Sequence, residues 1–137
     1  MLPYIFTLDF KVRDYECDLQ GIVNNSVYQQ YLEHTRHEFL LSRGVDFAQL
    51  AANGIHLVVT RAEIDYKRPL TSGDTFRVGL NIMRASKVRF QFLQDIYRLP
   101  DEQVMIKGVV IGTALNERGR PTVIDEIERL IESGPSS

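Results

Sequence analysis

One short stretch of the chain combines residue types that can support chemistry at a carbonyl group. Residues 17–28 read CDLQGIVNNSVY, so the carboxylate of Asp18 precedes Gly21 and the pair Asn24 and Asn25. A helix that begins near Asn25 offers free backbone N–H groups and a positive dipole end, which can hold a negative charge that develops on oxygen. Gly21 lets the chain approach a ligand closely. An Asp in a loop also commonly makes a turn by binding nearby N–H groups, so both interpretations of Asp18 stay open.

Length and composition limit the class of protein that can carry this stretch. The chain has 137 residues, of which 44% are hydrophobic, enough for one domain with a packed core. The net charge of −2 gives no general reason to expect a nucleic acid partner. The sequence has one cysteine, no signal-peptide pattern at residues 1–3 and no apolar run near the roughly 18 residues of a membrane span. We therefore expect a cytoplasmic protein with no membrane partner.

The spacing of apolar residues predicts the elements that position this stretch. Alternation over residues 4–13 predicts a strand, and helical spacing from Ser26 to Gly44 predicts a helix of about five turns. After a short helical connector, four more strands are expected, and the C-terminal segment could add a short helix before a disordered tail. The expected ranges are 46–52 for the connector, 58–66, 76–82, 88–96 and 104–115 for the strands, 121–131 for the last helix and 133–137 for the tail.

This order of elements predicts an α+β fold. An antiparallel five-stranded sheet should wrap around one long central helix, because a helix of marked hydrophobicity must be covered. We expect residues 1–137 to form a single domain. Apolar residues on both faces of the strand at 104–115 suggest that a second copy of the chain covers part of the outer face. A homodimer is the expected minimum, and a homotetramer is equally open.

The same residues resemble a known family. Residues 18–36, DLQGIVNNSVYQQYLEHTR, are similar to the pattern D-x-x-G-x-V-x-N-x-x-Y-x-x-Y-x-E-x-x-R of the hotdog-fold acyl-CoA thioesterases of the 4-hydroxybenzoyl-CoA thioesterase type. Residues 64–74, IDYKRPLTSGD, resemble the second signature of that family, a strand that ends in Y-x-x-P-L-x-x-G-D. With the matching order of elements, the likeness covers about residues 5–125.

The resemblance implies a hydrolase that cleaves the thioester of an acyl-CoA, or of an acyl carrier protein, to a free acid and a thiol. It implies that Asp18 either attacks the carbonyl carbon or activates a water molecule, and the sequence leaves both roles open. Asn25 occupies a position at which some relatives carry His or Tyr near the thioester. Ile22 stands where one branch of the family has a His, so Asp18 lacks that acid–base partner. The predicted catalytic residues are Asp18, Asn25 and Gly21.

Substrate contacts are expected in the same segment and at basic residues. Asn24 or Asn25 could simply cap the helix, and Tyr28 could be either a core residue or a wall of the acyl pocket. The phosphates of coenzyme A or phosphopantetheine call for Arg and Lys as charged donors, although such residues also occur on solvated sheet edges. The predicted substrate-binding residues are Asn24, Ser26, Tyr28, Lys67, Arg68, Arg84, Lys87 and Arg89.

Neither a metal nor a cofactor is expected, apart from coenzyme A as part of the substrate. His34 and His37 lie three residues apart on the predicted helix, but one helix offers too few ligands for a metal ion. Two other functions stay open. The chain could bind or sense acyl-CoA without turnover, or it could be a dehydratase or hydratase of acyl thioesters. The last needs a His–Asp pair, and no His lies near Asp18 in the sequence.

Overall fold

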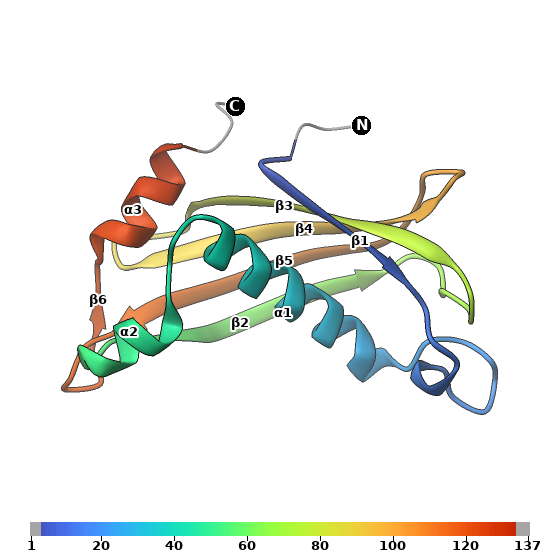
Figure 1. The fold of residues 1–137 in the computed structure, drawn as a ribbon, viewed down its shortest axis with the longest axis horizontal. Helices are drawn as coiled ribbons and strands as arrows, with labels where there is room; N and C mark the ends of the chain where they lie inside the picture. Colours follow the sequence, from blue (N-terminus) through green and yellow to red (C-terminus); the bar gives the residue numbers. More distant parts are fainter. Residues whose placement is uncertain (1–3, 134–137) are drawn as a thin grey trace.

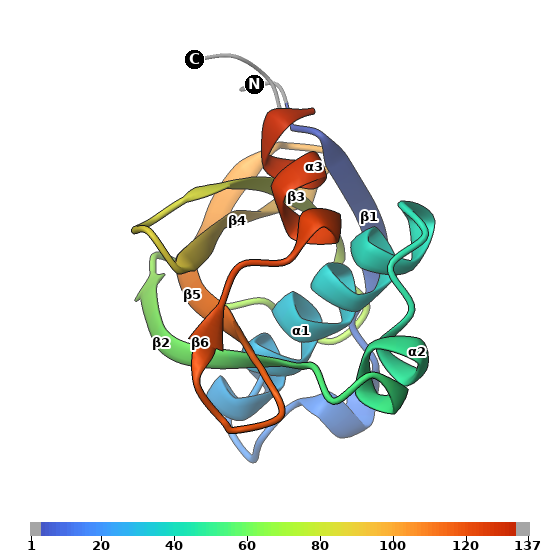
Figure 2. The same cartoon turned by 90° about the vertical axis from the view of Figure 1, so that its left-hand side faces the viewer.

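A curled antiparallel sheet surrounds one long helix in the computed structural model, which describes residues 4–133 (Figures 1 and 2). The strand order is β1-β3-β4-β5-β2, and β6 pairs with the end of β5. The predicted α+β architecture with a central helix is confirmed. The strands are β1 (Phe6–Lys11), β2 (His56–Tyr66), β3 (Thr75–Arg84), β4 (Arg89–Leu99), β5 (Gln103–Leu115) and β6 (Pro121–Thr122). The helices are the 3-10 turn η1 (Asp14–Glu16), α1 (Asn25–Ser42), α2 (Phe47–Ala52) and α3 (Asp125–Glu132).

The central helix α1 has the boundaries that its sequence predicts. Asn24 is the N-cap, and its Oδ1 atom accepts a hydrogen bond from the Ser26 N–H at 3.0 Å. The helix ends at Ser42 with Arg43 as its C-cap, after which Gly44 adopts a φ of 81°, a left-handed conformation that glycine takes without a steric penalty. The buried side chains of the helix are Tyr28, Tyr31, Leu32, Thr35, Arg36, Phe39 and Leu40.

The buried face of α1 packs against two hydrophobic clusters. The first surrounds the N-terminal half of the helix and includes Tyr28, Leu32 and Leu70. The second surrounds the C-terminal half and includes Phe39 together with Leu130 of α3. In Figure 2 the sheet is seen end-on and curls around α1 from β1 to β2, while α3 closes one end. The helix is thus held on a rigid scaffold along its whole length.

Three details differ from the sequence-based expectation or lie outside it. The sheet has six strands instead of five, because the two-residue strand β6 pairs with Ala114 and Leu115. A bulge between Val59 and Arg61 interrupts the regular alternation that was expected along β2. The predicted disordered tail begins at Ser133, which is the C-cap of α3, and its residues 134–137 lie outside the described part of the chain.

Candidate active site

The two sequence signatures meet at the start of α1. The Val23 N–H donates to the Leu70 carbonyl oxygen at 2.9 Å, and the Leu70 N–H donates to the Tyr28 hydroxyl oxygen at 2.9 Å. Ile22 also forms an isolated bridge with Thr71. Both Leu70 and Tyr28 are buried, so these hydrogen bonds lie in a dry environment. The segment after β2 therefore fixes the loop that carries Asp18.

The loop around Asp18 closes on itself. The Asp18 N–H donates to the Ile22 carbonyl oxygen at 2.9 Å, and the Gly21 N–H donates to the Asp18 carbonyl oxygen at 3.0 Å. Gly21 has a φ of 80°, which residues with a side chain rarely adopt. The Asp18 side chain accepts a hydrogen bond from the Gln20 N–H through Oδ1 at 2.9 Å. Asp18 thus makes a turn, and its carboxylate is still exposed to solvent.

The N-terminus of α1 retains one backbone donor. Asn24 Oδ1 accepts from both the N–H and the hydroxyl of Ser26, each at 3.0 Å, and the Val27 N–H donates to the Asn24 carbonyl oxygen. The Asn25 N–H has no acceptor within residues 4–133. No acidic residue lies in the first turn of α1, so nothing there neutralises the positive end of the dipole. A developing oxyanion can therefore bind at Asn25.

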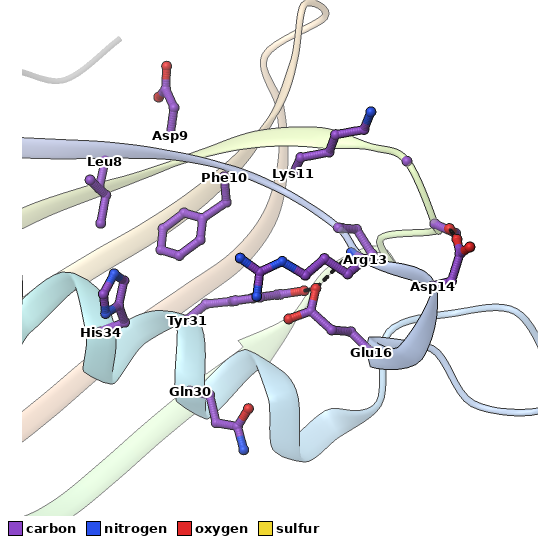
Figure 3. A pocket seen from close by; sticks show the side chains of 13 residues that line it. Leu8, Asp9, Phe10, Lys11, Arg13, Asp14, Glu16, Gln30, Tyr31 and His34 are labelled. Atoms are coloured by element: carbon purple, nitrogen blue, oxygen red, sulfur yellow. Dashed lines mark hydrogen bonds between the residues drawn. The ribbon is translucent and has the colours of Figure 1, made fainter.

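Glu16 and Tyr31 attach the loop to the side of α1, as Figure 3 shows. Glu16 Oε1 accepts hydrogen bonds from the Tyr31 hydroxyl and from the Arg13 N–H, both at 2.8 Å. The Glu16 carbonyl oxygen also accepts from the Asn24 N–H at 3.0 Å. Burial, and then the hydrogen bond to Glu16, raise the pKa of Tyr31, so the phenol stays a donor at neutral pH. This pair could not be predicted from the sequence, because its residues are 15 positions apart and match no motif.

Cavities flank α1 on both sides. A cavity of about 850 Å³ lies between β1, η1 and α1, and Phe10, Tyr31, His34 and Arg13 are among its lining residues (Figure 3). Asp18 does not line this cavity. On the other side of α1, toward β2, lie two smaller cavities of about 350 Å³ and about 220 Å³. Three large side chains of this part of the chain are also exposed, with Tyr15 at 76%, Leu19 at 107% and Tyr66 at 48%.

The predicted basic residues fall into two groups at opposite ends of the sheet. Lys67 and Arg68 directly follow β2, where their N–H groups donate to the Met105 carbonyl oxygen at 2.8 and 3.2 Å, near the Asp18 loop. Arg84 and the hairpin residues Lys87 and Arg89 lie at the far end of β3, whose ten residues span about 30 Å. Arg84 is also paired with Glu128 of α3. One chain does not bring this second group to Asp18.

The histidine and cysteine side chains on or near α1 are in surroundings that do not indicate a reactive or metal-binding role. His34 lies 3.8 Å from Glu38, and the His37 ring packs edge-on against Phe47. Partial burial and the neighbouring carboxylates raise the pKa of the half-buried Cys17 thiol, which disfavours the reactive thiolate. Within residues 4–133, no group of three or more His, Cys, Asp or Glu side chains is placed to hold a metal ion. No helix in this part of the chain is both long and apolar enough to cross a bilayer.

Comparison with known proteins identifies the family to which this chain is similar. The model of the Thioesterase-like superfamily matches residues 12–127. The acyl-acyl carrier protein thioesterase ATL3 of Arabidopsis thaliana, a chloroplast protein, is 38% identical over 117 residues, which are 85% of this chain and 62% of the relative. The chain thus spans about three fifths of the length of that relative. A 1,4-dihydroxy-2-naphthoyl-CoA hydrolase of Thermosynechococcus vestitus is 26% identical over 133 residues, covering 90% of this chain and 91% of the relative.

A solved structure has the same fold. The crystal structure of a 1,4-dihydroxy-2-naphthoyl-CoA thioesterase from Synechocystis superposes with a TM-score of 0.87, at 21% identity, over 93% of this chain and 96% of that one. The family match covers most of the chain, and it agrees with the resemblance of both sequence signatures. The chain belongs to the Thioesterase-like superfamily and has the hotdog fold.

Proposed function

We propose that this chain hydrolyses the thioester of an acyl group carried by coenzyme A or by an acyl carrier protein. The observation that carries the proposal is the closed loop of Asp18, which leaves the carboxylate exposed and precedes by a few residues the N-terminus of α1. Family membership supports it, as do the activities that the names of the plant and cyanobacterial relatives state. Both carriers present the same phosphopantetheine thioester, so the chemistry at the carbonyl is shared.

Each part of the site has a role in this proposal. The Asn25 N–H and the positive end of α1 stabilise the negative charge that builds on the carbonyl oxygen as the carbon is attacked. Asp18 acts either as the nucleophile, through an anhydride that water then cleaves, or as the base that removes a proton from the attacking water. In both cases the C–S bond breaks, the thiol leaves with a proton and the acyl group becomes a free carboxylate. Gly21 keeps the loop in the conformation that aims Asp18.

The test is thiol release from a panel of acyl-CoA and acyl carrier protein substrates, from short aliphatic to long-chain and aromatic. We expect Asp18→Asn to lower kcat by about two orders of magnitude or more without unfolding the protein. Asp65→Asn, which changes an exposed carboxylate on β2, is the matched control and should keep wild-type rates. If wild type binds acyl-CoA but hydrolyses none of the panel, the chain is a binding or sensing module and the proposal fails.

We further propose that the working form is a homo-oligomer in the cytoplasm, with a homodimer as the minimum and a homotetramer equally open. Asp18 is exposed, as are the side chains of Tyr15, Leu19 and Tyr66, and a second copy could cover such apolar surface. Val109 and Ile111 on the outer face of β5 are only half buried in the single chain, which supports the expected apolar contact between copies. Lys67 and Arg68 remain the best placed donors for substrate phosphates, because they lie at the same end of the sheet as Asp18.

A further inference from the structure

Arg36 is a buried cation that forms no ion pair with any other residue of the described range 4–133. Its side chain lies on the inner face of α1, and the residue is only 8% exposed. Among the described residues its one hydrogen bond runs from Nη1 to Gln94 Oε1 at 3.1 Å, and no carboxylate lies within 4.0 Å of its guanidinium nitrogens. A guanidinium has five N–H donors, and buried charges in proteins are as a rule paired. The remaining donors of Arg36 have no acceptor among the described residues, and none of them is sealed from solvent, so they are open to the adjoining cavities.

The local residues do not supply that missing charge. Gln94 is fully buried and neutral, and its Nε2 atom donates to the Leu32 carbonyl oxygen at 2.9 Å, which fixes the orientation of the amide. Glu33 precedes Arg36 by three positions on α1, but it is exposed and forms no ion pair with it. Burial lowers the pKa of Arg36, and Glu33 only partly opposes this. The guanidinium nevertheless stays charged at neutral pH, because its ordinary pKa is above 12.

Arg36 lies where two cavities between α1 and β2 meet. It lines the cavity of about 350 Å³ and the cavity of about 220 Å³, and Glu33, Val59 and Val110 also line both. The smaller cavity is polar toward the N-terminus of α1, where Gln29 and Gln30 line it. The larger one is mostly apolar. Its apolar lining residues are Leu40, Phe47, Leu57, Val58, Val59, Phe90, Phe92 and Val110.

We propose that the larger cavity binds a carboxylate with an apolar tail, of the kind of a short- or medium-chain fatty acid, with the carboxylate paired to Arg36. A planar carboxylate matches the parallel donors of a guanidinium, and the apolar lining matches the tail. Eleven residues of helix separate Arg36 from Asn25, roughly 16 Å along the axis, so within one chain this site lies apart from the one at Asp18. A free acid is also the product class of the proposed hydrolysis, but binding at Arg36 requires no turnover.

The test is isothermal titration calorimetry of the full chain with octanoate. We expect wild type to bind octanoate, and Arg36→Met to weaken the affinity at least tenfold. Octan-1-ol has the same tail without the charge, so it should bind wild type and Arg36→Met with equal, weaker affinity. Arg118→Met, which changes an exposed arginine in a loop, is the matched control and should bind octanoate as wild type does.

A second variant keeps Arg36 and gives its guanidinium a carboxylate partner within the protein. Gln94→Glu places a carboxylate beside Nη1 of Arg36, so octanoate affinity should fall at least tenfold although the cation is intact. Thermal unfolding of each variant confirms that it is folded before titration. If wild type does not bind octanoate, or if both variants bind it as wild type does, the proposal is wrong. A change in the oligomeric state of Arg36→Met without any octanoate binding would assign the cation to a subunit contact instead.

Discussion

At the scale of single residues, Tyr28 shows how a core side chain supports the loop that carries Asp18. Its hydroxyl oxygen accepts the Leu70 N–H at 2.9 Å, and both residues are buried. Tyr28→Phe keeps the ring but leaves that N–H without a partner, so we expect a loss of about 1–3 kcal/mol in the free energy of unfolding, measured with urea. Tyr15→Phe, at an exposed tyrosine, is the control. An equal effect of the two substitutions would contradict this role.

Residue roles could be predicted from the sequence where they depend on near neighbours. The left-handed Gly21, the N-cap Asn24 and the turn made by Asp18 all involve partners within a few positions. Two hydrogen bonds join residues that are far apart in the sequence: Tyr28 and Leu70 are 42 positions apart, and Arg36 and Gln94 are 58 positions apart. No local sequence pattern predicts such a contact. These contacts depend on the tertiary fold, because the sheet places segments side by side that are distant in the sequence.

At the scale of elements, the start of α1 is both a structural boundary and the proposed oxyanion site. Asn24→Ala removes the acceptor for the Ser26 N–H, so we expect it to lower the free energy of unfolding by about 0.5–2 kcal/mol. Asn24→Asp keeps an acceptor and should restore most of that loss. Urea unfolding measures both effects. If Asn24→Ala and Asn24→Asp were equally destabilised, the cap would not be the cause.

Helices and strands whose apolar residues recur at a regular spacing could be predicted from the sequence, and elements without such a spacing could not. The 18-residue helix α1 and the strands β3 and β4 follow from apolar spacing alone. The strand β6 has two residues, too few to show any alternation. The bulge in β2 inserts one residue at an edge strand, and it shifts the alternating pattern without any glycine or proline to indicate it.

At the scale of the whole molecule, buried phenols make the stability sensitive to alkaline pH. The pKa values of Tyr4, Tyr28 and Tyr31 are all raised, in each case chiefly by burial. The folded chain therefore keeps these protons at pH values where the unfolded chain, with a tyrosine pKa of 10.0, loses them. Their contribution is complete below about pH 10 and is lost as the pH rises above it.

Tyr31→Phe tests this dependence because it removes one titrating group and keeps the ring. We expect the fall in the free energy of unfolding above about pH 10 to be shallower in Tyr31→Phe than in wild type, when urea unfolding is repeated across the pH series. Tyr15→Phe should leave the slope unchanged, because Tyr15 is exposed. Parallel curves for Tyr31→Phe and wild type would show that the phenol of Tyr31 does not contribute.

The proposed association of two copies also belongs to the whole molecule, because a sheet that covers one helix has an outer face with no layer over it in the single chain. Ile111 lies half buried on β5, and β5 is next to the edge strand β2.

Light scattering should give wild type the mass of a dimer or a larger assembly. Ile111→Lys should shift it toward the monomer, because a buried contact cannot accept an unpaired charge. Thr7→Lys, on the other edge strand, is the control and should not shift the mass. If Ile111→Lys keeps the wild-type mass, the outer face of β5 is not the interface. If the monomer forms and still releases thiol at the wild-type rate, one chain completes the site without a partner.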